Sequence, residues 1–224
     1  MDGTGRRAVR RSDALTKARI VAAAIEVLDA DKSGDGSALT LRALMTQLTT
    51  GSGAIYHHVA TMDELRGLAA DEVLRSPFDS ANEADPNDAL LAATLAIFDS
   101  IQAHPWVGGQ LTRSAIQPAV VRIWKTIALQ LERLGIHGQA GATAGSTLTS
   151  FVLGSVANNG SGPSRFANAE ERMARLESMS EEWAKRESDP LVQDIATQLR
   201  EHDDRQQFLD GVRIILRGVA ASKE

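Results

Sequence analysis

Apolar residues recur at helical spacing along most of this 224-residue chain. Steps of three and four residues return to the same side of a helix, so residues 16–30 form one amphipathic helix with a stripe of Ile20, Val21, Ala24, Ile25 and Leu28. Similar spacing and helix-start signals predict further helices near residues 40–48, 52–59, 61–76, 86–104, 106–114, 118–134, 139–159, 166–186, 190–201 and 204–220. No run shows sustained strand-like alternation, so we predict an all-α protein.

The segment from Leu39 to Val59, LTLRALMTQLTTGSGAIYHHV, predicts two short helices joined by a tight turn. Thr40 is placed to cap the first helix, and four apolar residues share one of its faces: Leu41, Leu44, Met45 and Leu48. In the second helix Ile55 and Val59 point into a core, and the residues left to face outward are Ser52, Gly53, Ala54, Tyr56 and His57. This pattern indicates a helix-turn-helix, whose second helix enters the major groove of DNA.

Several segments resemble one known family. Ala54-Ile55-Tyr56-His57-His58-Val59, followed by Asp63-Glu64-Leu65, is similar to the DNA-binding domain of tetracycline-repressor (TetR) family regulators. His104-Pro105-Trp106, Phe151-Val152-Leu153-Gly154 and the stretch from Phe208 to Gly218 resemble the tetracycline-repressor type of C-terminal domain. The resemblance implies a bacterial protein with an N-terminal three-helix helix-turn-helix domain and a C-terminal helical domain for ligand binding and dimerisation.

This resemblance predicts a division of the chain into four parts. Residues 1–12 form a flexible basic arm, residues 13–60 the DNA-binding domain, residues 61–76 a connecting helix, and residues 77–224 the ligand-binding and dimerisation domain. In the resembling family the helices matching 139–159 and 204–220 form a four-helix interface between two subunits. Taken on their residues alone, burial of both helices inside a single subunit is the favoured explanation.

The distribution of charge fits a nucleic-acid partner even though the net charge is −5. Residues 1–20 carry six basic and two acidic side chains, or +4, which leaves −9 for the rest of the chain. Four of the basic side chains lie in the predicted arm: Arg6, Arg7, Arg10 and Arg11. We expect the arm to follow the phosphate backbone or to reach a minor groove, and the alternative is a solvated tail without base contacts.

Composition excludes other classes of protein. Cysteine is absent, which rules out disulfides and thiolate metal sites, and no apolar stretch approaches the about 20 residues that cross a bilayer. The basic N-terminus lacks the apolar core of a signal peptide, so we expect a cytoplasmic protein without a membrane partner. The five histidines form no HExxH pattern, and the sequence contains no nucleophile elbow or Gly-rich phosphate loop, so we expect no enzyme, catalytic residue, cofactor or metal site.

The predicted DNA contacts centre on the helix-turn-helix. Arg42 lies where the resembling family places a base-reading side chain, and its planar fork can bind O6 and N7 of a guanine, although an isolated arginine is more often only solvated. Tyr56 and His58 match positions that touch phosphate in related proteins, while a surface role and a base contact stay open for His57. The family commonly has Lys where this chain reads Ala60-Thr61-Met62. The predicted contacts outside the arm are Thr40, Arg42, Ser52, Gly53, Ala54, Tyr56, His57, His58 and Thr61.

For an effector site the sequence offers composition and no motif. Apolar and polar residues at suitable places in the predicted body can line a cavity for a hydrophobic molecule, and each taken singly also fits the core: Phe98, Gln102, Trp106, Leu111, Trp124, Thr147, Phe151 and Asn158. In tetracycline-binding relatives an acidic residue that helps to hold a magnesium–drug complex stands at the position of Asn158. We therefore infer neither magnesium nor tetracycline.

Together these patterns predict a transcriptional regulator, in such families usually a repressor. We expect it to bind a palindromic double-stranded DNA operator as a homodimer and to be released by a small, hydrophobic effector. The alternative is a helical small-molecule-binding protein that has lost specific DNA binding, for which the missing Lys near Thr61 is the hint.

Overall fold

The computed structural model describes residues 15–31, 35–75, 85–113, 116–161, 169–199 and 202–221, and within these ranges every regular element is a helix. The helices are α2 (Lys17–Asp29), α3 (Leu41–Leu48), α4 (Ser52–Tyr56), α5 (Met62–Val73), α7 (Pro86–Ala103), α8 (Trp106–Leu111), α9 (Pro118–Arg133), α10 (Gly138–Ser161), α11 (Ala169–Arg186), α12 (Pro190–Gln198) and α13 (Asp204–Ala221). The all-α prediction is confirmed. The predicted helices are present, with ends shifted by a few residues.

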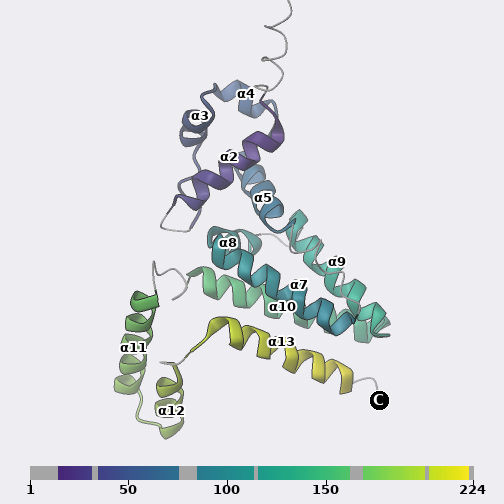
Figure 1. Ribbon diagram of the computed structural model, residues 1–224, viewed down its shortest axis with the longest axis vertical. Coiled ribbons are helices and arrows are strands. Elements are labelled where there is room, and N and C mark those ends of the chain that lie inside the picture. Colours follow the sequence, from purple (N-terminus) through teal and green to yellow (C-terminus); the bar gives the residue numbers. More distant parts are fainter. Residues whose placement is uncertain are drawn as a thin grey trace, which may run out of the picture.

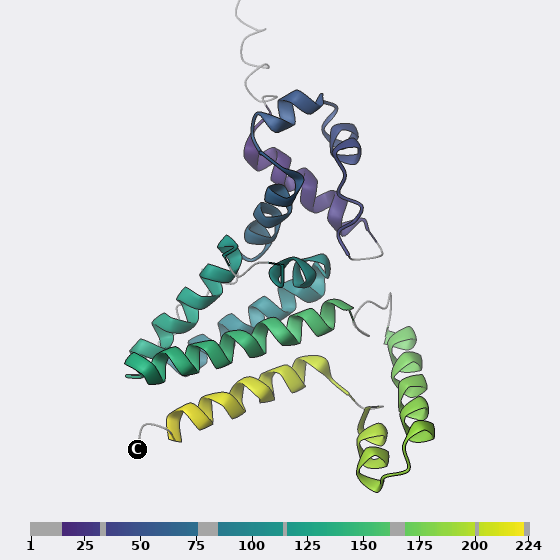
Figure 2. The ribbon, with the colours of Figure 1, turned by 180° about the vertical axis from the view of Figure 1, so that it is seen from behind.

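The helices form a small head and a larger body (Figure 1). Helices α2, α3 and α4 make the head at one end of the molecule, and α5 leads from it to the body of α7, α8, α9, α10 and α13. Seen from behind, α11 and α12 form a hairpin beside the body (Figure 2). Within the described ranges, no helix combines the length and the apolar character needed to span a membrane. The predicted domain boundaries stay predictions, and residues 1–12 and 76–84 lie outside the described residues.

Local signals in the sequence set where several helices begin. Thr16 caps α2 by accepting a hydrogen bond from the Arg19 backbone N–H at 3.2 Å. Asp85 caps α7, and Pro86 occupies its first turn, where a missing N–H costs nothing. The same Asp-Pro pair begins α12, with Asp189 as the cap. These caps satisfy backbone donors that a helix cannot satisfy itself.

The core of the head brings one apolar residue from each of its helices against α5. Ile20 of α2, Leu44 of α3, Ile55 of α4 and Leu65 of α5 are all 0% exposed. Burial of such a side chain stabilises a fold by roughly 1.5–3 kcal/mol. The short helices α3 and α4 therefore depend on this core, because isolated helices of such length are marginal in water.

The body is organised around α10, which packs against α8, α9, α7 and α13. Three phenylalanine rings from different helices of the body stack on one another. The ring centroid of Phe208 of α13 lies 4.8 Å from that of Phe98 of α7 and 5.5 Å from that of Phe151 of α10. A half-buried ion pair joins the body to α5, with Arg122 Nη2 of α9 donating to both oxygens of Asp71 at 2.8 and 2.9 Å. The connecting helix is thus fixed to the body through its C-terminal half.

Candidate nucleic-acid interface

The first helix of the motif is capped as the sequence predicts. The Thr40 hydroxyl oxygen accepts a hydrogen bond from the Ala43 backbone N–H at 3.1 Å, and the side chain is exposed. The helix ends at Thr49, whose φ of 49° lies in the left-handed region. The N–H of Thr50 donates back to the Met45 carbonyl at 3.1 Å. This backbone reversal turns the chain toward α4.

The second helix, α4, is held by apolar residues and presents small and polar ones. Ile55 and Val59 are 0% and 2% exposed, as predicted. The opposite face carries the predicted contact residues Ser52, Gly53, Ala54, Tyr56 and His57, all exposed, with Tyr56 at 46%. His58 is half-buried, and its ring meets that of His57 edge-on with centroids 5.2 Å apart. The helix lies at the far end of the molecule from α13, where a duplex can approach it (Figure 1).

Arg42 lies in the first turn of α3, the first helix of the motif. Its side chain is exposed, and within the described residues its guanidinium has no hydrogen-bond or ion-pair partner. Its backbone carbonyl accepts a hydrogen bond from the Thr46 hydroxyl at 3.0 Å, which strengthens the turn of helix that carries it. An exposed guanidinium on a capped helix is suited to a bidentate contact with guanine or to a contact with phosphate.

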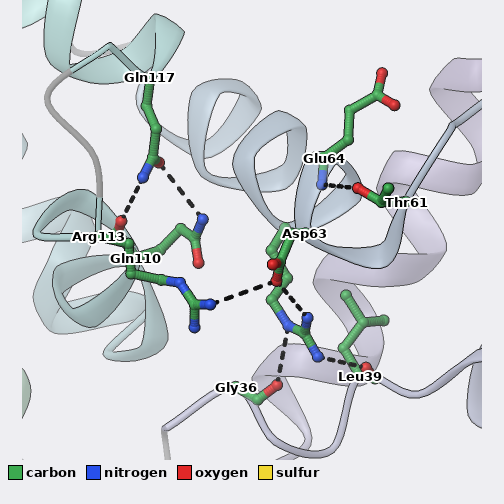
Figure 3. Close-up of polar contacts among 9 residues, drawn as sticks. Gly36, Leu39, Thr61, Asp63, Glu64, Gln110, Arg113 and Gln117 are labelled. Carbon is green, nitrogen blue, oxygen red and sulfur yellow. Dashed lines mark hydrogen bonds and ion pairs between the residues drawn. The ribbon is translucent and has the colours of Figure 1, made fainter.

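The junction after α4 is closed by Glu64, a residue that the sequence analysis did not assign to the site. The Thr61 hydroxyl oxygen accepts from the Glu64 backbone N–H at 3.0 Å (Figure 3). The Glu64 carboxylate accepts from the Ala60 N–H at 2.6 Å and from Lys17 Nζ at 3.2 Å. The Ala60 N–H, and after it Lys17, hold the pKa of Glu64 below its ordinary value. The spacing Thr-x-x-Glu is a capping-box signal that could have identified this role.

Arg66 of α5 fixes the chain that leads into α3. Its Nη2 donates to the Leu39 carbonyl at 2.9 Å and its Nε to the Gly36 carbonyl at 3.4 Å. Its Nη1 pairs with Asp63 Oδ1 at 3.0 Å, and Arg113 at the end of α8 reaches the same oxygen at 3.6 Å (Figure 3). No sequence motif marks Arg66, because the two carbonyls that it binds are brought to it only by the fold.

The residues predicted for an effector site are spread through the body. Phe98 and Gln102 line one cavity of about 500 Å³, and Thr147 lines a groove of about 1080 Å³ between α10 and α13. Trp106 and Leu111 are buried on α8, Trp124 is 38% exposed on α9, and Phe151 belongs to the phenylalanine stack. The side chain of Asn158 and the arm residues Arg6, Arg7, Arg10 and Arg11 lie outside the described residues. The role of each in binding stays a prediction.

The described residues contain no group of three His, Asp or Glu side chains placed to hold a metal ion. Lys17 of the head is paired with Glu64, and Glu26 and Asp29 have partners on α3 and on the body. The geometry of this end of the molecule therefore fits a surface that binds a polyanion by hydrogen bonds and local positive charge.

Comparisons with known proteins agree with this geometry. No family model matches the chain. The structure of the transcriptional regulator SCO7222, a TetR from Streptomyces coelicolor, is similar with a TM-score of 0.77 and 35% identity, over 92% of this chain and 98% of that one. ActR from the same organism, in complex with actinorhodin, has a TM-score of 0.74 over 93% of this chain and 98% of that one, but only 23% identity, which shows the fold alone.

A curated relative was found by sequence. A helix-turn-helix-type transcriptional regulator from Saccharopolyspora erythraea is 28% identical over 151 residues, or 66% of this chain, and the match spans 62% of that relative's own length. The resemblance inferred from the helix-turn-helix segment is confirmed by the match to SCO7222, which extends over nearly the full length of both chains. The chain belongs to the TetR family of transcriptional regulators, which are not enzymes.

Proposed function

We propose that this protein is a homodimeric, ligand-responsive regulator that binds a palindromic operator and is released from it by a small, largely apolar effector. The observation that carries the proposal is the exposed face of α4, together with the exposed Arg42 on α3, in a head that packs against the capped helix α5. Two such heads related by a two-fold axis would meet half-sites about 34 Å apart.

In this proposal Arg42 reads a base edge, and Ser52, Gly53 and Ala54 bring the backbone of α4 close to the duplex. Tyr56, His58 and the hydroxyls of Thr40 and Thr61 are the donors to phosphate, and His57 is the candidate for a further base contact. The oxygens of both hydroxyls accept backbone N–H bonds within the protein, and each O–H hydrogen is left to donate outward. The four arginines of the arm supply further phosphate contacts.

The second copy would pack on the outer faces of α10 and α13. These helices leave an open groove of about 1080 Å³, whose lining is small or apolar at Ala140, Thr143, Thr147, Ile215 and Val219. Ile214 on the same helix α13 is 66% exposed, which is unfavourable for an apolar side chain in a monomer. Small residues allow a partner helix to approach closely, and two helices from each subunit would form a four-helix interface.

The effector would enter the cavity of about 500 Å³ that Phe98 and Gln102 line together with Asp99, Arg172, His202 and Arg205. This volume lies within the range of small-molecule sites, and Phe98 connects the cavity to the stack with Phe208 and Phe151. Phe98 offers the effector one aromatic surface, and the ionisable side chains that make up most of the remaining lining, Asp203 and Asp204 among them, offer partners for its polar groups. Because ActR was solved with actinorhodin, actinorhodin is a suitable first probe.

The proposal is tested by binding of the purified chain to labelled DNA from the region upstream of its own gene, measured by fluorescence polarisation. Specific binding should survive excess unrelated DNA, and its stoichiometry should be two chains for each operator. Addition of actinorhodin tests release in the same assay. A chain that binds the probe but no duplex, at low ionic strength, would instead support the helical small-molecule-binding protein that has lost operator recognition.

A further inference from the structure

One carboxylate joins the C-terminal end of α2 to the start of α8. Asp29 is the last residue of α2, and its Oδ1 accepts a hydrogen bond from Trp106 Nε1 at 2.8 Å and lies 2.7 Å from His104 Nδ1. These partners follow Asp29 by 77 and 75 residues, so the contact joins the head to the body. Figures 1 and 2 both place this end of α2 next to α8.

The position of Asp29 is unfavourable for α2 itself. The C-terminal end of a helix carries partial negative charge, and no basic residue stands in the last turn of α2 to offset an acid there. Glu26, the other acid in that turn, has a partner in another helix, because Gln47 of α3 donates to it at 2.6 Å. The stabilisation of Asp29 therefore comes from its contacts with the body.

Trp106 needs the same contact from its side. Trp106 is only 3% exposed, so its indole N–H cannot donate to bulk water. A buried indole N–H is left unsatisfied unless the protein supplies an acceptor. The acceptor is supplied by the head. His104 packs edge-on against the Trp106 ring, with centroids 6.4 Å apart, so both donors of the His-Pro-Trp segment converge on one oxygen.

The second polar link from the head side to α8 is weaker. Asp63 and Arg113 are 3.6 Å apart, and their side chains are 66% and 57% exposed, a setting in which ion pairs contribute little. Asp29 and His104 are 34% and 29% exposed and 2.7 Å apart. By distance and burial, the Asp29 contact is the stronger of these two links to α8.

We propose that Asp29, His104 and Trp106 are positioning residues that fix the head relative to the body, and thereby the spacing of the two reading helices. The head is joined to the body along the chain through α5, which packs against α2 on the head side and against α8 and α9 of the body. The Asp29 contact adds a separate link between α2 and the body, which resists rotation of the head about α5. The consequence for operator affinity rests on the proposed function, whereas the restraint on the head does not.

The restraint is measured by the distance between a spin label on the head and one on the body. The chain contains no cysteine, so Ala22→Cys on α2 and Glu132→Cys on α9, both exposed, can be labelled without other changes. Labelled chains are diluted with unlabelled ones, so that distances within one chain dominate. The test variants are Trp106→Phe, which keeps the ring but removes the N–H, and Asp29→Ala. Trp183→Phe, the same change at an exposed site on α11, is the matched control.

We expect a broader or shifted distance distribution in Trp106→Phe and Asp29→Ala, and an unchanged one in Trp183→Phe. Asp29→Asn keeps a carbonyl oxygen that can accept from Trp106, so it should restore a narrow distribution. Thermal unfolding of each variant is followed separately, because a purely structural role lowers the midpoint without changing the distance in the folded chain. Distributions as narrow in Trp106→Phe and Asp29→Ala as in the control would overturn the proposal.

Binding to the upstream DNA is then compared among the unlabelled proteins. Because Trp106→Phe removes one charge-assisted hydrogen bond, we expect its affinity for the DNA to fall by at most about tenfold. The affinity of Trp183→Phe should not change. Absence of DNA binding by the unmodified chain would count against the proposed function alone, since the label distances still decide the role of Asp29. Equal affinities of Trp106→Phe and Trp183→Phe, when the unmodified chain binds, would overturn the link between the restraint and DNA binding.

Discussion

Replacement of Thr49 by glycine should stabilise the protein, although glycine usually weakens a fold. Thr49 ends α3 with a φ of 49°, and it is the one described residue other than glycine with a positive φ. Its side chain is exposed, so little packing is lost when it is removed. The backbone reversal that it makes is normally assigned to glycine or asparagine, because a branched Cβ crowds the following carbonyl there.

The size of the effect follows from two opposing contributions. An L-residue in the left-handed region costs about 1–2 kcal/mol, and β-branching places Thr49 toward the upper end. Glycine relieves that strain, but it also gives the unfolded chain more conformational freedom, which lowers the free energy of unfolding by about 0.5–1 kcal/mol. We therefore expect Thr49→Gly to raise the free energy of unfolding by about 0.5–1 kcal/mol, equivalent to roughly 1–4 °C in a chain of this size.

The neighbouring threonine gives a matched control. Thr50 is not among the described residues with positive φ, so Thr50→Gly gains no relief and should lower the free energy of unfolding by about 0.5–1 kcal/mol. Both variants are compared by urea unfolding at one protein concentration, because the proposed dimer would make stability concentration-dependent. If Thr49→Gly loses as much stability as Thr50→Gly, the left-handed turn is not strained and the reasoning is refuted.

Four further outcomes are expected. Arg42→Ala should weaken operator binding by about 1–3 kcal/mol and relax the preference at one base pair, and an unchanged preference in a binding-site selection would remove its reading role. Deletion of residues 1–11 should reduce the slope of log affinity against log salt by about 0.9 for each phosphate that the arm neutralises, so an unaltered slope would mean that the arm neutralises none. The Ala60 N–H and Lys17 lower the pKa of Glu64 from its ordinary value of 4.5. Their contacts therefore stabilise the folded protein fully above pH 4.5, and this stabilisation is lost as the pH falls through the pKa of Glu64 in the folded state. Glu64→Gln should flatten this part of the dependence of the free energy of unfolding on pH. Gly211→Ala should lower the free energy of unfolding, because the added Cβ would overlap the Phe151 ring. Gly67→Ala has open space at its Cβ and should raise the free energy of unfolding by up to about 1 kcal/mol. Equal changes in the unfolding midpoint of the two variants would contradict the packing around Phe151.

The elements that could be predicted from sequence are those whose signals are local. Thr40 and Thr61 cap helices, the Asp85-Pro86 pair starts α7, and Ile55 and Val59 are buried, because each depends on residues within one or two turns. The turn between α3 and α4 shows the limit of such signals. Its left-handed residue is Thr49, whereas Gly51 has an ordinary φ of −90° that any residue can adopt.

Contacts between distant segments could not be predicted in the same way. Trp106 fits an aromatic wall of a ligand cavity by composition, yet its N–H is bound to Asp29, 77 residues earlier. Arg66 binds two backbone carbonyls, which carry no side-chain signature at all. Composition ranks a residue as apolar or polar, but the fold decides which of several partners it meets.

The shape of the reading surface indicates how such a regulator would be controlled. Helix α4 has five residues and offers few side-chain donors, so base contacts by this helix alone supply limited affinity. In the proposed complex, most of the binding energy would then come from phosphate contacts made by the arm and by both heads, and these contacts carry little sequence information. Because phosphates repeat along any duplex, discrimination depends on holding two heads at one spacing. A change in the angle between head and body would therefore weaken operator binding while every side chain of the reading surface stays in place, and a ligand that prefers the altered angle is sufficient to release the protein.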